Sequence, residues 1–320
     1  MEQDNQNFYP DDKIRGMIYA VCLGDALGLP FEFYFSKHNR YTGRLIDNRL
    51  ERKNRWGNHT ILDYGQISDD GEMTIIMLNH IKKYDNIELD KLVLDYLCWA
   101  NNPTSCCMGK NTSLLFKGIK TYNGYKNRYK NIDPNNQSNG HLMRASPLSL
   151  LDDEDLWDKE CMITNPHPTC IFINRLYINM IKKCLSGIDK QIIISEALNK
   201  CSNSNILDIQ EVFGQIKTNT LRDTSKQKGW VVHSLYCVLY CFIHFNTIEE
   251  VMEWIINQKG DTDTNGAIVC GIFGAYMGYN KLYEQQADNI DVLRKCDTHG
   301  GNKVRPSEYR VSYIDEILKS

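Results

Sequence analysis

Residues 260–279 read GDTDTNGAIVCGIFGAYMGY, and this segment constrains the arrangement of the chain more than any other. Small residues stand at positions 267, 270, 271, 274, 275 and 278, where they allow a second helix to approach closely. The apolar run is too short for a transmembrane dimerisation motif. We therefore predict a buried central helix over residues 264–279.

Apolar residues recur at spacings of three and four in seven further segments, which is typical of amphipathic helices. These segments are residues 11–28, 69–83, 89–100, 169–185, 192–200, 228–245 and 248–258. Alternating strand patterns are scarce, and the polar stretches 36–66 and 121–139 lack the Pro/Gly/Ser character of an interdomain linker. The sequence predicts an all-α fold, a compact multi-helix single domain over residues 11–320 preceded by a disordered N-terminus, residues 1–10.

The composition excludes several classes of partner. The net charge of −3 shows no basic excess for nucleic acid, and no apolar run reaches the roughly 18 residues of a membrane span. The N-terminal MEQDNQNFYPDD lacks the regions of a signal peptide. None of the twelve cysteines forms C-x-x-C, and Cys98, Cys237, Cys241 and Cys270 lie among apolar residues. We expect a cytoplasmic protein with reduced, buried thiols.

Two short acidic segments depart from ordinary helix composition. The first is QISDDGEMTI, residues 66–75, and the second opens the segment quoted above. Helix capping alone can explain the first, because Ser and Asp accept hydrogen bonds from free amides at a helix start. The two segments together offer only oxygen ligands, which Mg²⁺ prefers, from Ser68, Asp69, Asp70, Asp261, Asp263 and Thr264.

A shared metal site explains why like charges stand side by side. Two Mg²⁺ ions would neutralise the four carboxylates and orient a water or a substrate hydroxyl. A Mg²⁺ phosphohydrolase that uses Asp261 and Asp263 is a weaker interpretation, because no alternating strand precedes this motif.

Four segments in order resemble the ADP-ribosylglycohydrolase family, whose members remove ADP-ribose from acceptors. They are GMIYAVCLGDALGLPFEF (16–33), SDDGEM (68–73), SNGHLMRASPL (138–148) and GDTDTNGAIVCGIFGAYMG (260–278). The resemblance implies an all-α fold with a binuclear Mg²⁺ centre between helix termini. It also implies Mg²⁺-dependent hydrolysis of the glycosidic bond between ADP-ribose and an ADP-ribosylated protein or a small ADP-ribosyl substrate.

Carried over by position, the resemblance assigns roles to individual residues. The metal ligands are Ser68, Asp69, Asp70, Asp261, Asp263 and Thr264. Glu32 or Asp70 handles the proton as the catalytic residue, and the choice between them stays open. The substrate-binding residues are Gly109, Ser138, Asn139, Gly140 and His167.

Some positions depart from the family pattern. Gly71 replaces a threonine, Asn165 replaces a histidine, and His141 and Leu142 are bulkier than the usual pair. We expect Gly71→Thr to raise Mg²⁺ affinity or rate, because it restores a hydroxyl beside the metals. The departures leave open the alternative of a non-catalytic ADP-ribose-binding or structural relative. The acceptor and the oligomeric state are not identified.

Overall fold

The chain is almost entirely helical in the part that its structure, a computed structural model, describes. Residues 9–32, 41–47, 51–53, 59–105, 107–301 and 303–319 are described, with the backbone alone for 51–53 and 59–61. The α-helices are α1 (Asp11–Gly28), α2 (Asp69–Tyr84), α3 (Leu89–Ala100), α4 (Lys110–Phe116), α5 (Tyr122–Tyr129), α6 (Glu154–Met162), α7 (Pro168–Leu185), α8 (Lys190–Ser202), α9 (Leu207–Lys217), α10 (Val231–His244), α11 (Ile248–Gln258), α12 (Thr262–Met277), α13 (Tyr279–Lys295) and α14 (Ile314–Ile317).

Short elements connect these helices. The 3-10 helices are η1 (Leu29–Phe31), η2 (Leu45–Asp47), η3 (Leu142–Arg144), η4 (Ser146–Leu150), η5 (Ser307–Tyr309) and η6 (Val311–Tyr313). Strand β1 (Glu51–Lys53) pairs antiparallel with β2 (His59–Ile61), and β3 (Thr298–His299) pairs antiparallel with β4 (Lys303–Val304). The predicted all-α fold is confirmed.

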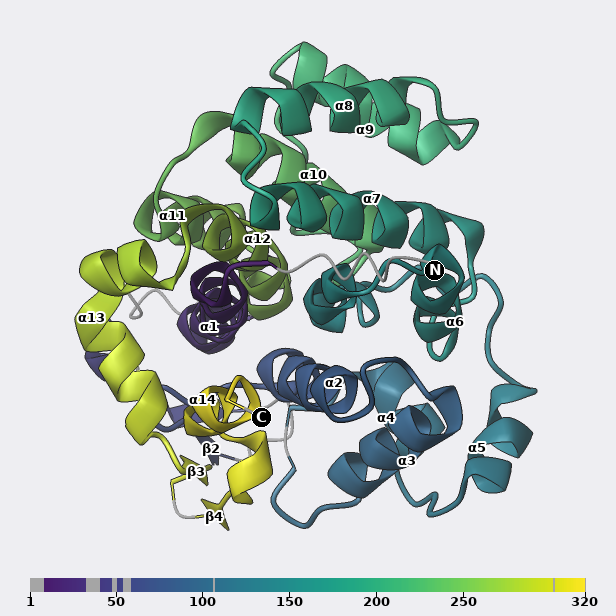
Figure 1. Ribbon diagram of the computed structural model, residues 1–320, viewed down its shortest axis with the longest axis vertical. Coiled ribbons are helices and arrows are strands. Elements are labelled where there is room, and N and C mark those ends of the chain that lie inside the picture. Colours follow the sequence, from purple (N-terminus) through teal and green to yellow (C-terminus); the bar gives the residue numbers. More distant parts are fainter. Residues whose placement is uncertain are drawn as a thin grey trace, which may run out of the picture.

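The centre of the molecule is an antiparallel pair of buried helices, α1 and α12 (Figure 1). Glycines face each other across this pair: a Cβ atom on Gly24 would overlap the carbonyl of Gly266, and one on Gly274 would overlap that of Gly16. The two backbones are therefore in direct contact, which only glycine allows. The buried central helix is confirmed, although it begins at Thr262 and ends at Met277.

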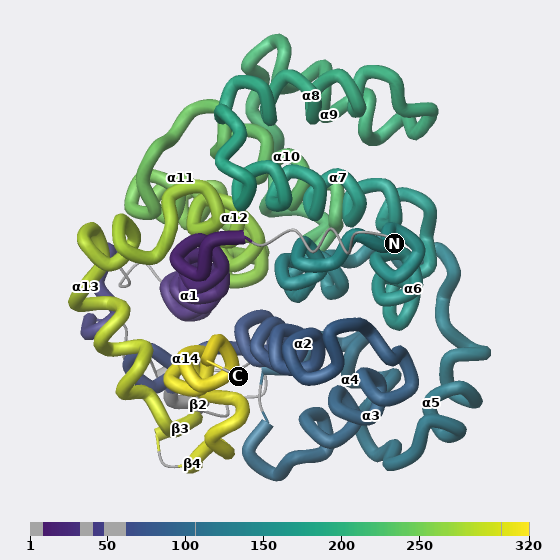
Figure 2. Tube along the Cα trace, viewed as in Figure 1, coloured from purple at the N-terminus to yellow at the C-terminus, as the bar shows by residue number. Residues whose placement is uncertain are grey.

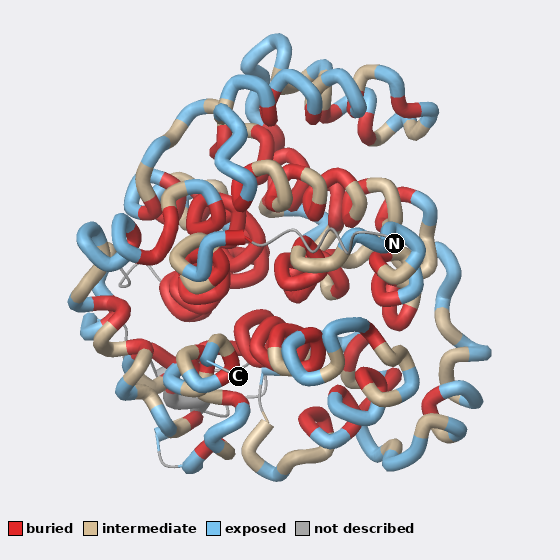
Figure 3. The backbone as a smooth tube through the Cα atoms, in the orientation of Figure 1, coloured by how far each residue is buried: buried red, intermediate tan, exposed pale blue. Residues whose placement is uncertain are grey.

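The remaining helices surround this pair. Helix α2 packs against both α1 and α12, and Figure 3 shows that all three are buried along most of their length. Helices α8 and α9 form an outer layer, and α3, α4 and α5 cluster beyond α2. In Figure 2, α1 lies next to segments from the opposite end of the chain, because α13 and α14 both contact it.

Three predicted helices, over residues 11–28, 89–100 and 248–258, match α1, α3 and α11. The prediction that residues 121–139 form only a polar connection was wrong, because α5 lies within them. A stripe of aromatic rings stabilises it: Tyr122 stacks on Tyr125, and Tyr125 also contacts Tyr129 and Phe116. The Thr121 hydroxyl caps its start by accepting a hydrogen bond from Gly124 N–H.

Helix α1 meets one criterion for a membrane span. Together with η1 it covers Asp11–Phe31, which is long and apolar enough by length and composition alone, with a mean hydropathy of 1.3. Counting unbroken apolar runs missed this helix, because Asp25 and several glycines interrupt the run. In the structure 94% of its apolar window is buried, and contact with α12 accounts for its composition.

The described cysteines are all free thiols, and Cys237, Cys241 and Cys270 are buried as expected. Cys98 is exposed, so its predicted burial was wrong: it lies on the outer side of α3. At the N-terminus, residues 1–8 lie outside the described residues, whereas Tyr9 is buried in the core and Pro10 precedes α1.

Candidate metal centre and substrate loops

Helices α1, α2 and α12 bring five carboxyl groups together. Carboxylate oxygens of Asp25, Asp70 and Asp263, one from each helix, lie within 4.8 Å of one another and are buried. A second group of three, Glu32, Asp261 and Asp263, meets the same distance limit, and Glu32 in it is half-buried. Asp263 belongs to both groups. The arrangement therefore offers two adjacent oxygen-rich positions that share one carboxylate.

The start of α2 combines capping with ligand placement. The Ser68 hydroxyl accepts a hydrogen bond from Asp70 N–H (3.2 Å) and donates one to Asp70 Oδ2 (2.7 Å). Asp25 Oδ2 accepts from the N–H groups of Ser68 (2.8 Å) and Gly71 (2.9 Å). The capping interpretation is thus correct for Ser68, and it is compatible with a metal role for Asp70, whose Oδ1 has no hydrogen-bond partner.

The start of α12 does not follow the capping pattern. Asp261 occupies the N-cap position, yet its side chain makes no capping hydrogen bond. Its Oδ2 instead accepts from Asn139 Nδ2 at 2.8 Å. The Thr264 hydroxyl donates to Asp70 Oδ2 at 3.4 Å and so links the starts of α12 and α2. Capping therefore does not explain the second acidic segment.

The electrostatics of the cluster call for a cation. Burial raises the pKa of Asp25 to about 7, and burial followed by neighbouring carboxylates raises the pKa of Asp70 well above its ordinary value. Burial and then Glu32 do the same to the pKa of Asp263, and burial raises the pKa of Asp261. Among the described residues no Lys, Arg or His forms an ion pair with these four groups.

The chemistry of the cluster fits Mg²⁺. Buried charges normally need a partner, and Oδ1 of Asp25 and Oδ1 of Asp70 are buried without a hydrogen bond. The donors are carboxylate and hydroxyl oxygens, which hard cations such as Mg²⁺ prefer over zinc. The residues present are therefore suited to hold a hard divalent cation.

Sequence reasoning missed Asp25 as a site residue. It lies in the quoted segment GMIYAVCLGDALGLPFEF, and its side chain is fully buried. The available signal was a single carboxylate inside an otherwise apolar helix, since such a group is rarely buried without a partner. Glu32 and Asp70, the two predicted catalytic residues, are both brought to the cluster.

Asp69 lies at the rim of the cluster. It belongs to neither group of three carboxylates, and its Oδ2 accepts a hydrogen bond from Gly109 N–H at 2.9 Å. Burial is the main reason that the pKa of Asp69 is raised, and Asp25 and Glu32 contribute. The contact places the predicted substrate residue Gly109 directly beside a predicted metal ligand.

The predicted substrate loop, residues 138–140, lies against the start of α12. Asn139 N–H donates to the Gly229 carbonyl at 2.8 Å, and its side chain donates to Asp261. Cβ atoms built on Gly109 and Gly140 would each contact the Thr112 hydroxyl, at 4.0 and 3.8 Å. The loops that carry these two glycines therefore converge on Thr112 beside the carboxylates.

Asn165 and His141, two residues that differ from the family pattern, lie beneath this loop. Asn165 Nδ2 donates to the Ser138 carbonyl and to the Ser138 hydroxyl, both at 3.0 Å. His141 is fully buried, and burial followed by the Arg144 charge lowers its pKa to about 3. A neutral His141 and Asn165 thus fill space beneath the loop.

His167 has a structural contact. Its Nδ1 accepts a hydrogen bond from Thr169 N–H at 3.2 Å and caps α7, and its Nε2 lies 3.5 Å from Gln137 Nε2. A role for His167 in substrate binding stays a prediction.

The structure reverses the expectation for Gly71→Thr. A Cβ atom at this position would lie 3.0 Å from both Asp25 Oδ2 and Ile67 Cδ1. We now expect the substitution to destabilise the metal-free protein by about 1–3 kcal/mol, typical of overpacking, without a gain in Mg²⁺ affinity. Thermal melting and calorimetric Mg²⁺ titration check this result. Gly214→Thr is the matched control, because a Cβ there meets nothing within 4 Å; tighter Mg²⁺ binding by Gly71→Thr would restore the original expectation.

Comparison with known proteins agrees with this geometry. A sequence model of the ADP-ribosylglycohydrolase family matches residues 5–300. The chain therefore belongs to the ADP-ribosylglycohydrolase family, and it is a glycosidic hydrolase.

One relative and one solved structure extend the comparison. The chain is 22% identical over 293 residues to the ADP-ribosyl-(dinitrogen reductase) glycohydrolase of Rhodospirillum rubrum, covering 88% of this chain and 91% of the relative. A solved structure described as an ADP-ribosylglycohydrolase-related protein complex superposes with a TM-score of 0.65 at 19% identity. The superposition covers 89% of this chain and 98% of the solved chain. At this identity it supports the fold alone.

Proposed function

We propose that this protein is a Mg²⁺-dependent hydrolase of the cytoplasm that releases ADP-ribose from ADP-ribosylated proteins. The observation that carries the proposal is the pair of carboxylate groups that share Asp263. The relative from Rhodospirillum rubrum is named for an ADP-ribosylated protein, which supports a protein substrate here. The free thiols of the described cysteines suit a reducing compartment.

The cluster suggests which residues hold two Mg²⁺ ions. Asp25, Asp70 and Asp263 would serve one position, and Asp261 with Asp263 the other. Ser68, Asp69 and Thr264 remain predicted ligands. Bound Mg²⁺ would neutralise the carboxylates and make a bound water more acidic.

Glu32 is the better candidate for the proton-handling residue. Its carboxyl group is half-buried beside Asp261 and Asp263, so it combines contact with the cluster and access to solvent. Asp70 is fully buried, and its Oδ2 already accepts from the hydroxyls of Ser68 and Thr264. Glu32 would accept the proton of the attacking water, while the loops carrying Gly109 and Asn139 hold the ADP-ribose.

The test compares linkages. Peptides with arginine-linked, serine-linked and acid-linked ADP-ribose are incubated with the protein in Mg²⁺ or in chelator, and released ADP-ribose is measured by mass spectrometry. We expect Mg²⁺-dependent release from at least one linkage. Glu32→Gln should slow it by about 10²–10⁴-fold, the usual contribution of proton transfer, with Mg²⁺ binding retained. Binding of ADP-ribose without release from any linkage would overturn the proposal in favour of a non-catalytic binder.

A further inference from the structure

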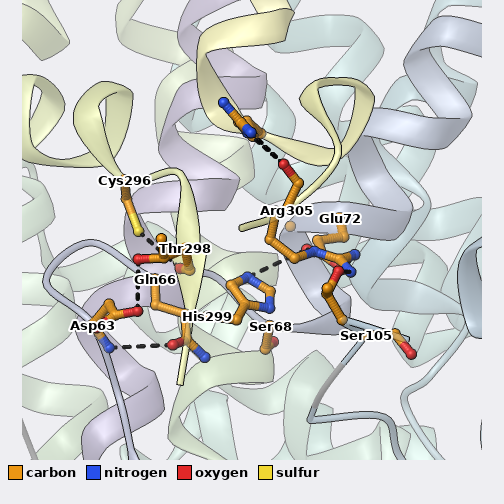
Figure 4. Close-up of polar contacts among 12 residues, drawn as sticks. Asp63, Gln66, Ser68, Glu72, Ser105, Cys296, Thr298, His299 and Arg305 are labelled. Atoms are coloured by element: carbon orange, nitrogen blue, oxygen red, sulfur yellow. Dashed lines mark hydrogen bonds and ion pairs between the residues drawn. The ribbon is translucent and has the colours of Figure 1, made fainter. Parts of the chain in front are cut away.

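A C-terminal hairpin closes over the start of α2. It consists of β3, β4, the glycines between them and Arg305, and we call it the C-terminal clasp. Figure 4 shows its side chains facing Asp63, Gln66 and Glu72. Arg305 lies beyond residues 5–300, the range that the family sequence model matches.

The clasp first holds the loop that leads into α2. Asp63 Oδ2 accepts hydrogen bonds from the Thr298 hydroxyl (2.8 Å) and from Gly301 N–H (2.9 Å). Gln66 Oε1 accepts from Gly300 N–H at 3.1 Å. Ser68, the capping residue of α2, follows two positions later. The path of the chain into the metal-bearing helix is therefore fixed by the clasp.

The clasp also grips the first turn of α2 through a buried ion pair. Arg305 donates from Nε to Glu72 Oε1 (2.7 Å) and from Nη2 to Glu72 Oε2 (2.6 Å). Trp99 Nε1 donates to the same Oε2 at 2.6 Å, and His299 Nε2 lies 3.4 Å from Oε1. Glu72 is fully buried and Arg305 is 2% exposed. Such a bidentate pair fixes orientation as well as distance.

The remaining donor nitrogen of Arg305 contacts the loop between α3 and α4. Its Nη1 donates to the Thr104 hydroxyl at 2.6 Å and lies 3.4 Å from Asn102 Oδ1. This loop, between α3 and α4, leads to Gly109, whose N–H donates to Asp69. Arg305 therefore joins both partners of the Asp69–Gly109 contact, the helix through Glu72 and the loop through Thr104.

We propose that Arg305 and Glu72 are positioning residues, which hold Asp69, Asp70 and Gly109 in the geometry that binds Mg²⁺ and substrate. Desolvation makes a buried ion pair weak support for stability, and an uncharged pair of similar size is often equally stable. The bidentate contact instead fixes the orientation of Arg305 relative to the first turn of α2. The proposal rests on the proposed function.

The test separates position from stability. The double variant Glu72→Gln/Arg305→Met removes both charges of the pair and keeps an acceptor for Trp99 Nε1. We expect its melting temperature to stay close to that of the wild type, because both charges are removed together. We also expect faster hydrogen exchange of the amides of residues 68–73 in the metal-free protein, and about 10-fold weaker Mg²⁺ binding by calorimetry.

Two further variants complete the design. Arg305→Lys keeps the charge without the fork, so its exchange rate and Mg²⁺ affinity should fall between those of the wild type and the double variant. Arg294→Met is the matched control, because the hydrogen bonds of Arg294 go to Tyr19 on α1 and Asp315 on α14. It should lower the melting temperature with unchanged exchange at residues 68–73.

The outcomes are distinct. Unchanged exchange and Mg²⁺ affinity in the double variant would show that the pair does not position the site, which overturns the inference. If the wild type binds no Mg²⁺, the proposed function fails, while the exchange of the metal-free protein still decides whether the clasp positions α2.

Discussion

Asp263→Asn is expected to abolish Mg²⁺ binding and hydrolysis while it raises the melting temperature of the metal-free protein. Asp263 is the carboxylate common to both groups, so its loss would affect both candidate metal positions at once. The loss of Mg²⁺ affinity and of activity should be larger than about 10- to 100-fold, which is the usual effect of removing a residue that only supports a metal ligand. The stability should rise because burial and neighbouring carboxylates raise the pKa of Asp263, which means that its charge opposes folding at neutral pH.

Thermal melting with and without Mg²⁺, calorimetry and product release measure these effects together. Asp208→Asn serves as a control, because Asp208 lies on α9, in the outer layer away from the carboxylates. A higher melting temperature without any Mg²⁺-induced shift would identify a folded protein that has lost its metal site. Hydrolysis at the wild-type rate by Asp263→Asn would contradict the assignment of the cluster.

The metal-free protein should lose stability as the pH rises from about 4 through 7, and Mg²⁺ should reverse the loss. An unfolded aspartate has a pKa of about 3.9, and burial raises that of Asp25 to about 7. Below pH 4 the carboxyl is protonated in both states and contributes nothing. Between these values the folded state keeps a proton that the unfolded state has released, so rising pH weakens folding. For Asp25 at pH 7 the free energy of unfolding falls by about 4 kcal/mol.

Melting temperatures at pH 5, 6, 7 and 8, with Mg²⁺ and with chelator, check this prediction. His141 has the opposite effect, because burial lowers its pKa to about 3. Below about pH 6.5 the unfolded state binds a proton that the folded state does not, so falling pH weakens folding. This effect of His141 on stability is the same with and without metal. The difference between the melting temperatures in Mg²⁺ and in chelator therefore reports the carboxylates. A Mg²⁺-induced shift of equal size at pH 5 and pH 8 would contradict the prediction.

The sequence predicted the fold class because several helices, among them α3, α7, α10 and α11, carry apolar residues at helical spacing. Helices α4, α5, α6, α9, α13 and α14 were missed. Among them, α5 depends on contacts between tyrosine rings, and α13 is mostly polar and kinked at Gln286. The main partner of α13 is α1, which is distant in sequence, and local patterns do not report such a contact.

The sequence predicted those residues of the candidate site that lie close together in short motifs. Asp70, Asp261 and Asp263 were found because they cluster along the chain, whereas Asp25 reaches the cluster only through the packing of α1. The clasp could not be foreseen for the same reason: Glu72 and Arg305 are separated by 233 positions. The exact space around Gly71 likewise depends on Ile67 and Asp25, so a missing hydroxyl could be read from the sequence but the crowding could not.

The glycine contacts between α1 and α12 distinguish two parts of the site that tolerate change differently. One part is the carboxylates carried by these helices, and the other is the loops around Gly109 and Asn139. Asp25 follows Gly24, and Asp263 stands three positions before Gly266, so the carboxylates are spaced by backbone against backbone. Any side chain added at these glycines would separate the two helices and the acidic groups with them. We therefore expect changes in substrate preference to arise in the predicted substrate loops around Gly109 and Asn139, near which His141 and Asn165 differ from the family pattern.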